Sequence, residues 1–431
     1  ELVATGHLHV LGIKDMAGLL KPQSARLLVG SIRAKYPDLP IHVHSHDTAG
    51  IAVASMLACA EAGADVIDAA IDSMSGLTSQ PSMGAIVSSL EQMELGTGIS
   101  HDNIQRLNLY WSEVRQLYQC FEQNVKASDS SVFDHEMPGG QYTNLMFQSQ
   151  QLGLGSQWSE IKHAYMEANM LCGDIVKVTP SSKVVGDLAQ FMVANKLSAR
   201  DVEERASTLD FPVSVVEFFQ GFLGTPPGGF PEPLRTHIIR NKERVDTRRG
   251  ASLPPLDFEK IKSDLTVKYR RPMSECDAVS WAMYPKVFEE FQAFIEEFGD
   301  LSRMPTRFFL GKPKAGEEMH IPIEDGKLLI VKLLGLGPFH EATGMRDVLF
   351  ELNSSPRSIS VKDLGANVEE VHHEKATSEP GSVGSPLAGV VVELKVKEGD
   401  AVKPGDAMFV MSAMKMETIV SAQIAGKVTR V

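Results

Sequence analysis

The first 95 residues alternate short apolar runs with helical patterns, and this alternation constrains the fold more than any other feature of the sequence. In order, the expected elements are a strand at 8–13, a helix after Pro22, a strand at 41–45, a helix at 51–62, a strand at 65–71 and a helix after Pro81. Strand–helix repeats of this length predict an α/β fold with a parallel sheet, either doubly wound or a (β/α)8 barrel. Since no Gly-x-Gly-x-x-Gly follows any of these strands, a dinucleotide-binding fold has no support.

The rest of the chain changes pattern three times. Residues 96–304 are mainly helical, with two apolar stripes that we expect in a core rather than against a cofactor. The stripes are Ile104, Leu107, Trp111, Val114, Tyr118 and Phe121, and then Ile161, Ala164, Tyr165 and Ala168. Residues 305–365 hold two hairpin patterns and indicate a small β-rich module. Residues 366–384 are polar and predict a flexible linker, on which the pair His372-His373 is not expected to bind metal.

Composition narrows the possible partners and compartment. With 43% hydrophobic and 23% charged residues over 431 positions, the chain has the make-up of a globular protein of about three domains. The formal net charge of −13 argues against nucleic acid and anionic membranes as partners, and no apolar run approaches the length of a membrane span. Four cysteines lie far apart without CxxC spacing, at Cys59, Cys120, Cys172 and Cys276. Neither a disulfide framework nor a zinc ribbon is indicated, and a reducing compartment fits.

The stretch Ile41-His-Val-His-Ser-His46 places three histidines on one face of a strand, because side chains alternate along a strand. Three inward histidines are costly unless they are hydrogen-bonded or bound to metal. In a barrel, chemistry concentrates at the C-terminal strand ends, which favours His44 and His46 as metal ligands and leaves His42 as a buried, hydrogen-bonded residue. Lys14 ends the preceding strand and is expected on the same rim; a salt bridge with a rim carboxylate is its alternative role.

Residues 385–431 contain an internal repeat, in which Leu387-Ala-Gly-Val-Val391 is echoed by Ile424-Ala-Gly-Lys-Val428. Short β-branched runs separated by Gly-Asp pairs predict strands and tight turns in a small β-sandwich. Between the two halves, Met414-Lys-Met416 puts Lys415 at a hairpin tip, displayed for covalent modification; an ordinary exposed lysine is the alternative. Since the second half stops soon after Gly426, we expect a chain that is a fragment, with an incomplete sandwich and exposed faces around Val390, Val392 and Met408.

These motifs resemble known ones. The Met-Lys-Met site resembles the biotinyl domain of biotin-dependent carboxylases, with a lipoyl carrier as the near relative. Three segments look like the carboxyltransferase domain of pyruvate carboxylases: Ile13-Lys-Asp-Met-Ala-Gly-Leu-Leu-Lys-Pro22, His44-Ser-His-Asp-Thr-Ala-Gly50 and Asp72-Ser-Met-Ser-Gly-Leu-Thr-Ser-Gln-Pro-Ser82. The loops at 136–145 and 178–187 and the run Gly224-Thr-Pro-Pro-Gly-Gly-Phe-Pro-Glu232 match as well.

The resemblance implies a domain plan. Residues 1–95 would be the last strands and helices of a carboxyltransferase TIM barrel, and 96–304 its helical funnel. Residues 305–365 would be part of a tetramerisation or allosteric domain, 366–384 a linker, and 385–431 a C-terminally incomplete biotinyl domain. The first barrel strands, with the aspartate, arginine and glutamine of the family's site, would precede Glu1.

The resemblance also implies the site residues. A divalent ion, Zn or Mn, would be held by His44, His46 and Lys14 as its carbamate, which supplies an oxygen ligand where an ammonium would repel the metal. Thr179 would be the catalytic threonine that shuttles a proton between pyruvate and biotin; a helix N-terminal cap is its alternative role. Ser182 and Lys183 would hold the biotin ureido group, and Lys415 would carry the biotin.

The implied reaction is carboxyl transfer from N-carboxybiotin to pyruvate, giving oxaloacetate for anaplerosis and gluconeogenesis. An upstream domain would use ATP, Mg and bicarbonate, and this stretch alone would be inactive. A homotetramer, a biotin protein ligase and acetyl-CoA as allosteric activator are the implied partners, in the cytoplasm of a bacterium or the mitochondrial matrix of a eukaryote. The α subunit of an oxaloacetate decarboxylase or a transcarboxylase is the alternative, and a metal-dependent aldol lyase would share the HxH barrel but have no use for Lys415.

Overall fold

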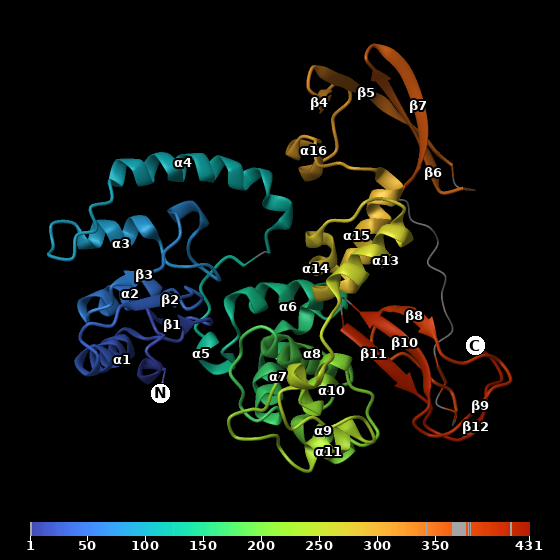
Figure 1. Cartoon of the computed structure of the whole chain (residues 1–431), viewed down its shortest axis with the longest axis horizontal. Coiled ribbons are helices and arrows are strands. Elements are labelled where there is room, and N and C mark those ends of the chain that lie inside the picture. Colours follow the sequence, from blue (N-terminus) through green and yellow to red (C-terminus); the bar gives the residue numbers. More distant parts are fainter. Residues whose placement is uncertain are drawn as a thin grey trace. The chain divides into compact units, whose positions relative to one another are not determined.

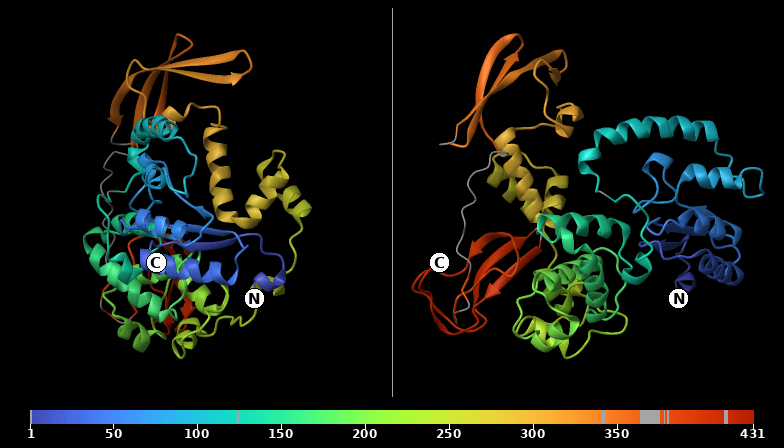
Figure 2. Two further views of the ribbon diagram at one scale, coloured as in Figure 1. Left: turned by 90° about the vertical axis from the view of Figure 1, so that its left-hand side faces the viewer. Right: turned by 180° about the vertical axis from the view of Figure 1, so that it is seen from behind.

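The computed structural model describes residues 2–431 except Asn124, 341–342, 364–375, Ser378, Pro380 and 414–415. These residues form two compact units, Glu1–Ala251 with Lys375–Val431, and Ser252–Glu374 (Figures 1 and 2). Much of the predicted linker, including His372-His373, lies outside the described residues. In the described part of the chain, no helix is long and apolar enough to cross a membrane.

The N-terminal part is a mixed α/β layer, as the alternation predicts. Strands β1 (Leu11–Asp15), β2 (Ile41–Ser45) and β3 (Val66–Ile67) form a parallel sheet in that order. They alternate with helices α1 (Pro22–Lys35), α2 (Ala52–Glu61) and α3 (Met83–Leu90). One face of the sheet is apolar and packs with the helices in a buried cluster that includes Val29, Ile41, Val43, Met56 and Cys59. The opposite face carries the histidines.

The first strand begins later than predicted, at Leu11 rather than Leu8. Pairing sets its start, because the Leu11 amide donates to the carbonyl of Pro40, directly before β2, at 2.9 Å. Residues 8–10 have no partner strand in the described structure, and Val10 is exposed. The strand ends at Asp15, so Lys14 lies within β1 and not beyond its end.

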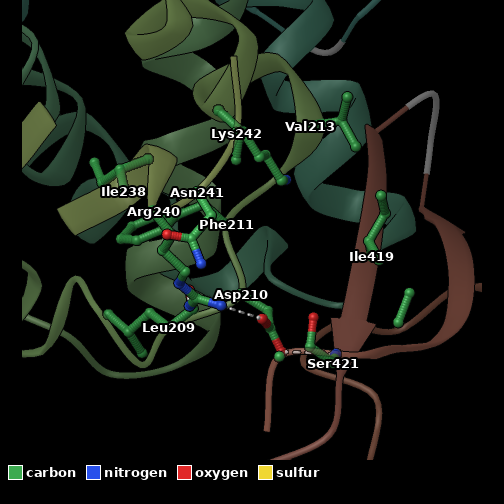
Figure 3. A pocket seen from close by; sticks show the side chains of 13 residues that line it. Leu209, Asp210, Phe211, Val213, Ile238, Arg240, Asn241, Lys242, Ile419 and Ser421 are labelled. Carbon is green, nitrogen blue, oxygen red and sulfur yellow. Dashed lines mark hydrogen bonds and ion pairs between the residues drawn. The ribbon is translucent and has the colours of Figure 1, made fainter. Parts of the chain in front are cut away.

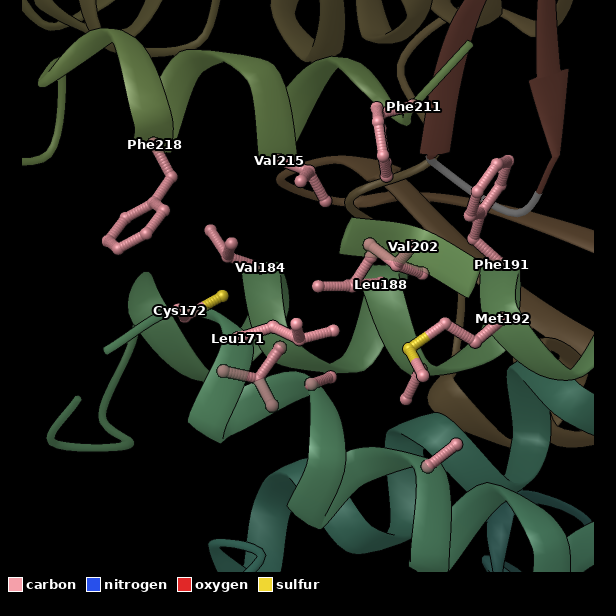
Figure 4. Packing of buried hydrophobic residues seen from close by; sticks show 14 of the residues in the cluster. Leu171, Cys172, Val184, Leu188, Phe191, Met192, Val202, Phe211, Val215 and Phe218 are labelled. Carbon is pink, nitrogen blue, oxygen red and sulfur yellow. The ribbon is translucent and has the colours of Figure 1, made fainter. Parts of the chain in front are cut away.

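Helices fill the next part of the same unit: α4 (His101–Leu117), α5 (Val132–His135), α6 (Gly139–Gln151), α7 (Trp158–Leu171), α8 (Ser181–Ala194), α9 (Ala199–Arg205), α10 (Val213–Gln220), α11 (Leu234–Ile239) and α12 (Arg249–Ser252). The predicted stripe on α7 is confirmed, since Ile161, Tyr165 and Ala168 are fully buried. They belong to the largest core of the molecule, which α8 crosses through Val184, Leu188, Phe191 and Met192 (Figure 4).

The other predicted stripe is not a core. On α4 only Ile104 is buried, while Leu107, Trp111 and, beyond the helix, Tyr118 and Phe121 are exposed. The stripe has helical spacing, but most of its side chains stay exposed in the described structure. Periodicity thus predicted the helix and its apolar face but not what packs against that face.

The C-terminal segment 385–431 returns to the first unit as two small sheets. Strands β8 (Val390–Leu394), β10 (Ala407–Ala413) and β11 (Met416–Ser421) form an antiparallel sheet in the order β11-β10-β8. Strands β9 (Ala401–Val402) and β12 (Gly426–Lys427) pair separately. Ala413 and Met416 pair with each other at the ends of β10 and β11, as a hairpin requires. Val390 and Val392 are exposed as expected, and Met408 is partly buried. We call residues 385–431 the carrier domain.

The second unit begins with helices α13 (Phe258–Tyr269), α14 (Glu275–Met283), α15 (Pro285–Phe298) and α16 (Thr306–Leu310). Its four strands form an antiparallel meander, β4 (Glu318–Glu324), β5 (Lys327–His340), β6 (Met345–Leu352) and β7 (Ser355–Lys362), as Figure 1 shows. Both predicted hairpins are present, β4–β5 and β6–β7. Asn353 and Ser354 both have positive φ, 46° and 66°, as a tight two-residue hairpin turn requires.

Candidate functional site

Strand pairing places Lys14 beside His44. In the parallel register of β1 and β2, Gly12 lies opposite His42 and Lys14 opposite His44. Side chains at paired positions point to the same face, so Lys14, His42 and His44 share the face opposite the apolar core. The strand register thus places Lys14 beside His44, on the rim where the sequence predicted both.

His44 and His46 turn the same ring nitrogen toward each other. The two Nε2 atoms are 3.4 Å apart. The other nitrogen of each ring is already engaged: His44 Nδ1 lies 2.7 Å from Asp68 Oδ2, and His46 Nδ1 lies 2.7 Å from the carbonyl oxygen of Thr78. A carbonyl can only accept, so His46 Nδ1 carries the proton; an ionised Asp68 requires the same of His44. Two lone pairs therefore face each other across the 3.4 Å gap.

This arrangement fits a bound divalent cation. In neutral rings the facing lone pairs repel, and a metal ion between them removes that repulsion. Tetrahedral Zn²⁺ with Zn–N bonds of about 2.0–2.1 Å places two ligand nitrogens about 3.4 Å apart. His44 and His46 each have a partner of the kind that fixes imidazole orientation in metal sites, a carboxylate on one ring and a carbonyl on the other. Burial lowers the pKa of His46, which keeps the ring neutral and able to ligate.

Two histidines do not complete a metal shell. Among the described residues no cluster of three or more His, Cys, Asp or Glu side chains has metal-binding geometry. Within this described part of the chain a further ligand would have to be of another kind, and Lys14 lies beside His44 in the sheet. As a carbamate it would supply oxygen, the donor that hard cations prefer.

Two glycines let the loops close around His46. Gly18 has φ of +80°, and a Cβ there would lie 2.3 Å from the carbonyl oxygen of His46. Gly139, the first residue of α6, would place a Cβ 2.5 Å from Thr78 O and 2.6 Å from His46 Nδ1. Its amide also donates to Met16 O at 2.9 Å. The Met137-Pro-Gly-Gly140 sequence thus allows the start of α6 to seat against His46 and leave it 8% exposed.

Asp68 is the site residue that sequence reasoning missed. Its carboxylate accepts from His42 Nε2 at 2.7 Å as well as from His44 Nδ1. Partial burial raises the pKa of Asp68, but the two histidine hydrogen bonds outweigh it and hold the pKa below the usual range. The predicted strand at 65–71 ran through Asp68, whereas the observed β3 ends at Ile67 and leaves Asp68 on the same rim as His44. His42 is hydrogen-bonded as predicted but not buried, since 40% of its side chain is exposed.

The 178–187 segment leads into α8 and holds the other predicted residues. Thr179 is exposed, and among the described residues its hydroxyl has no hydrogen-bond partner. It is not the helix cap considered as its alternative role, since the residue before α8 is Pro180 and no side chain caps the helix. Ser182 is 3% exposed. The Lys183 ammonium pairs with the Asp187 carboxylate, which is itself buried and also accepts from Ser214.

Helix α6 connects the two halves of the site. Its first residue, Gly139, touches His46. The same first turn packs on α8, where a Cβ on Gly186 would lie 2.6 Å from the side chain of Gln141. Farther along, Gln190 donates to Ser149 Oγ at 3.1 Å. The two helices therefore run side by side in the same direction, with both N-terminal ends toward the histidines. The predicted site residues of the barrel part and of α8 are brought to one end of this helix pair.

Lys415 lies outside the described residues. Its flanking strands are described, and Ala413 and Met416 on either side are 3% and 2% exposed. The prediction that Lys415 is the modified residue stays a prediction.

Comparison with known protein families divides the chain into three matches. Residues 2–109 match the HMGL-like family, 132–332 a conserved carboxylase domain, and 381–431 a family described as biotin-requiring enzyme. These matches cover the barrel part, the helical part with the start of the β-rich module, and the carrier domain.

Curated relatives match nearly the whole chain. Pyruvate carboxylase of Aspergillus niger is 57% identical over 422 residues, 98% of this chain and 35% of the relative. The mitochondrial pyruvate carboxylase of Mus musculus is 49% identical over 434 residues, 100% of this chain and 37% of the relative. The chain thus spans about a third of the length of these relatives.

Solved structures agree. The carboxyl transferase domain of Rhizobium etli pyruvate carboxylase with pyruvate and biocytin is 42% identical, with a TM-score of 0.77 over 84% of this chain and 61% of that one. The complete multifunctional enzyme from the same organism gives a TM-score of 0.75 over 84% of this chain and 35% of its own.

Proposed function

The chain belongs to the pyruvate carboxylase family over the stretch that it shares with those enzymes, and from this premise we propose that it takes part in carboxyl transfer from N-carboxybiotin to pyruvate. The product is oxaloacetate. The observation that carries the proposal is the pair of facing Nε2 atoms on His44 and His46, at the rim of a parallel sheet and beside Lys14.

The proposed metal ligands are His44, His46 and Lys14 as its carbamate. When bound, the ion would act as a Lewis acid that stabilises negative charge developing on pyruvate. The chain's own contribution is orientation: Asp68 and the Thr78 carbonyl hold the two rings with their lone pairs converging. The start of α6 covers His46 and keeps water from that side.

Thr179 is the proposed proton carrier. A methyl proton must leave pyruvate as the carboxyl group arrives, and a hydroxyl can accept one proton while giving up its own. The exposed Thr179 hydroxyl is uncommitted among the described residues, which suits this role. We propose that Ser182 and Lys183, on the next turn, hold the ureido group of biotin carried on Lys415.

The remaining roles extend beyond this chain. We propose that ATP, Mg and bicarbonate are used by a part of the protein outside the shared stretch. Assembly as a homotetramer, modification by a biotin protein ligase and activation by acetyl-CoA are proposed on the same family grounds. One relative is described as mitochondrial, so the mitochondrial matrix and the cytoplasm are the proposed locations.

The decisive experiment separates the two half-reactions. In the full-length protein that contains this stretch, Thr179→Ala should lower oxaloacetate formation by roughly 10²–10⁴-fold and leave ATP-dependent carboxylation of biotin unchanged. Thr208→Ala, an exposed threonine that bonds only the Arg205 carbonyl, is the matched control. Near-normal oxaloacetate formation by Thr179→Ala would refute the role of Thr179.

A further inference from the structure

One edge of the carrier domain is covered by the helical part of the same unit. Strand β11 is an edge strand, yet Thr418, Val420 and Ser421 are all at most 8% exposed. The other edge, β8, is open, with Val390 72% exposed. The cover over β11 consists of helix α10 and the short segment 209–213 that leads into it.

Specific backbone contacts fix this cover in place. The amide of Ser421 donates to Asp210 Oδ2 at 3.1 Å, and Thr418 forms an isolated antiparallel bridge with Pro212. Asp210 is held on its other side by Arg240, whose Nη1 lies 3.6 Å from Oδ1 (Figure 3). The segment 209–213 thus lies along the edge of the carrier sheet and contacts it through one isolated bridge and one side-chain acceptor.

A second, apolar contact lies at the hairpin end of β10 and β11. Leu152, just after α6, is in one buried cluster with Met411, Ala413 and Met416 of the carrier domain. Leu154 and Ala194, the last residue of α8, pack against that cluster. The strand ends on both sides of Met414-Lys415 are therefore held at the C-terminal ends of α6 and α8.

The proposed catalytic groups lie at the opposite ends of these helices. Gly139 touches His46 at the start of α6, and Thr179 and Ser182 lie at the start of α8. Helices of 13 and 14 residues, at 1.5 Å per residue, are each about 20 Å long. With β11 packed on α10, Ala413 and Met416 are thus held about one helix length away from the start of α6 and α8, where the proposed catalytic groups lie.

We propose that residues 209–213, with Arg240 and Leu152, form a docking surface on which the carrier domain of the same chain rests between transfers. The docked carrier is withheld from the site, so it must leave this surface before Lys415 can deliver its group. The docking surface itself follows from the contacts; its meaning as a resting position rests on the proposed function.

The contact is suited to release. A partly open cavity of about 270 Å³ lies between the two surfaces, with Ala407 among its lining residues. Leu209, Phe211, Ile238 and Lys242 line one side and Ile419 the other (Figure 3). Permanent interfaces pack like protein interiors and leave few voids larger than a water molecule. The polar part of the contact is one charge-assisted hydrogen bond and one bridge beside this cavity. The apolar part is the cluster of Leu152 with Met411, Ala413 and Met416, which has to separate when the carrier leaves.

Hydrogen–deuterium exchange on the 431-residue chain tests the docking surface without requiring biotin. In Asp210→Ala, peptides covering 416–421 should exchange about tenfold faster, because a hydrogen bond to a charged group is lost. Peptides from α6 should be unchanged. The control Glu203→Ala removes an exposed carboxylate of α9, from the same stretch of chain, and should leave β11 protected.

A second variant guards against misfolding of the first. Ser421→Pro removes the donating amide from the carrier side; that amide points away from β10, a position where an edge strand tolerates proline. Release of β11 in both variants, with β10 still protected, supports the docking surface. Unchanged protection of 416–421 in both variants overturns it, and protection that falls on dilution overturns the assignment to the same chain.

A separate experiment tests whether the docked carrier is a resting position. It measures the rate at which avidin captures the biotinylated protein. Undocking in Asp210→Ala should raise the capture rate about tenfold if the docked hairpin shields the biotin. Equal rates would overturn the resting role while the exchange result still stands. Absence of biotin by intact mass would instead reject the proposed function of Lys415 and leave the docking surface intact.

Discussion

Gly139 lies so close to His46 that a Cβ on this glycine would stand 2.6 Å from His46 Nδ1 and 2.5 Å from the Thr78 carbonyl that Nδ1 contacts. The helix start, the ring and the carbonyl are thus packed without room for one methyl group. Because Nδ1 is fixed, the orientation of Nε2 toward His44 depends on a residue 93 positions later in the chain.

Gly139→Ala should therefore disturb the metal site before it disturbs the fold. We expect the His46 ring to rotate away from Thr78, with a stability loss of about 1–3 kcal/mol typical of overpacking. Bound metal, measured by elemental analysis, should fall well below that of the parent. Gly140→Ala is the control, because a Cβ on Gly140 meets no atom within 4 Å. Equal metal content in the two variants would contradict the argument.

Asp68→Asn should weaken metal binding without removing a ligand. An amide side chain has one oxygen, so it can accept from His44 or from His42 but not from both. Loss of such an outer-shell partner typically costs 10–100-fold in metal affinity, and competition with a chelator measures it. His42→Phe removes the other partner of Asp68 and should keep near-parental affinity. If His42→Phe lowers the metal affinity as much as Asp68→Asn does, the Asp68 carboxylate does not act through His44.

His135 should make the fold sensitive to acid. Burial, followed by the nearby Lys162 charge, lowers the pKa of His135 to about 4 from the ordinary value of 6.5. Between these pH values His135 is protonated in the unfolded chain but not in the folded chain. The free energy of unfolding must therefore fall as the pH drops from 6.5 toward 4. The full loss in the free energy of unfolding from this one group is about 3 kcal/mol, at about 1.4 kcal/mol per unit of pKa shift.

The measurement is the denaturant midpoint of unfolding between pH 7 and pH 4. His135→Asn keeps an acceptor for the Met137 amide, which donates to His135 Nδ1 at 3.0 Å, but has no imidazole to titrate. Its midpoint should fall less steeply with acid than that of the parent. His163→Asn changes an exposed histidine on α7 and should keep the parental slope. Identical slopes for parent and His135→Asn would exclude His135 as the cause.

Lys183 has a structural partner as well as a proposed ligand. Its ammonium pairs with Asp187, and burial raises the pKa of Asp187 even though Lys183 and Ser214 both counteract it. Lys183→Met leaves a buried carboxylate without its cation and should cost about 2–4 kcal/mol, at the lower end because Lys183 is 42% exposed. Lys183→Met/Asp187→Asn should recover most of that stability.

Oxaloacetate formation then separates the two roles. If Lys183 holds biotin, the double variant should be stable yet still deficient in carboxyl transfer, with a raised Michaelis constant for free biotin analogues. A double variant that recovers both stability and transfer would show that Lys183 acts only on Asp187.

Most of the correct predictions about the candidate site came from the alternation of side chains along the strands. Alternation along Ile41–Ser45 placed His44 on the open face, and the parallel arrangement placed Lys14 beside it. Asp68 was missed because the predicted third strand ran on to residue 71, whereas the observed β3 ends at Ile67, directly before it. Gly139 was missed as well, because its contact with His46 joins segments that share no local pattern; only the Pro-Gly-Gly sequence hints that some backbone comes close there.

Packing between elements was the main limit. The stripes on α4 and α7 are equally periodic, but the α7 stripe lies in the largest core, whereas most of the α4 stripe is exposed among the described residues. Likewise, the turn residues of the carrier domain predicted its strands, whereas the seating of β11 on the 209–213 segment depends on the surface of a separate helical layer. Periodicity identifies an apolar face, and the tertiary structure decides its partner.

Lys415 should be the single site of biotin attachment in this chain. The reason is its place in the sequence, between Ala413 and Met416, which pair at the ends of β10 and β11, and the match of residues 381–431 to the biotin-requiring enzyme family. After co-expression with a biotin ligase, intact-mass measurement should show one added biotin, and Lys415→Arg should remove it completely. Lys403→Arg, which changes an exposed lysine of the same domain whose amide donates to Asp406, is the matched control and should be modified like the parent. Modification that persists in Lys415→Arg would reject the acceptor assignment, and with it the role of the Met-Lys-Met motif as the mobile carrier for the site at His44 and His46.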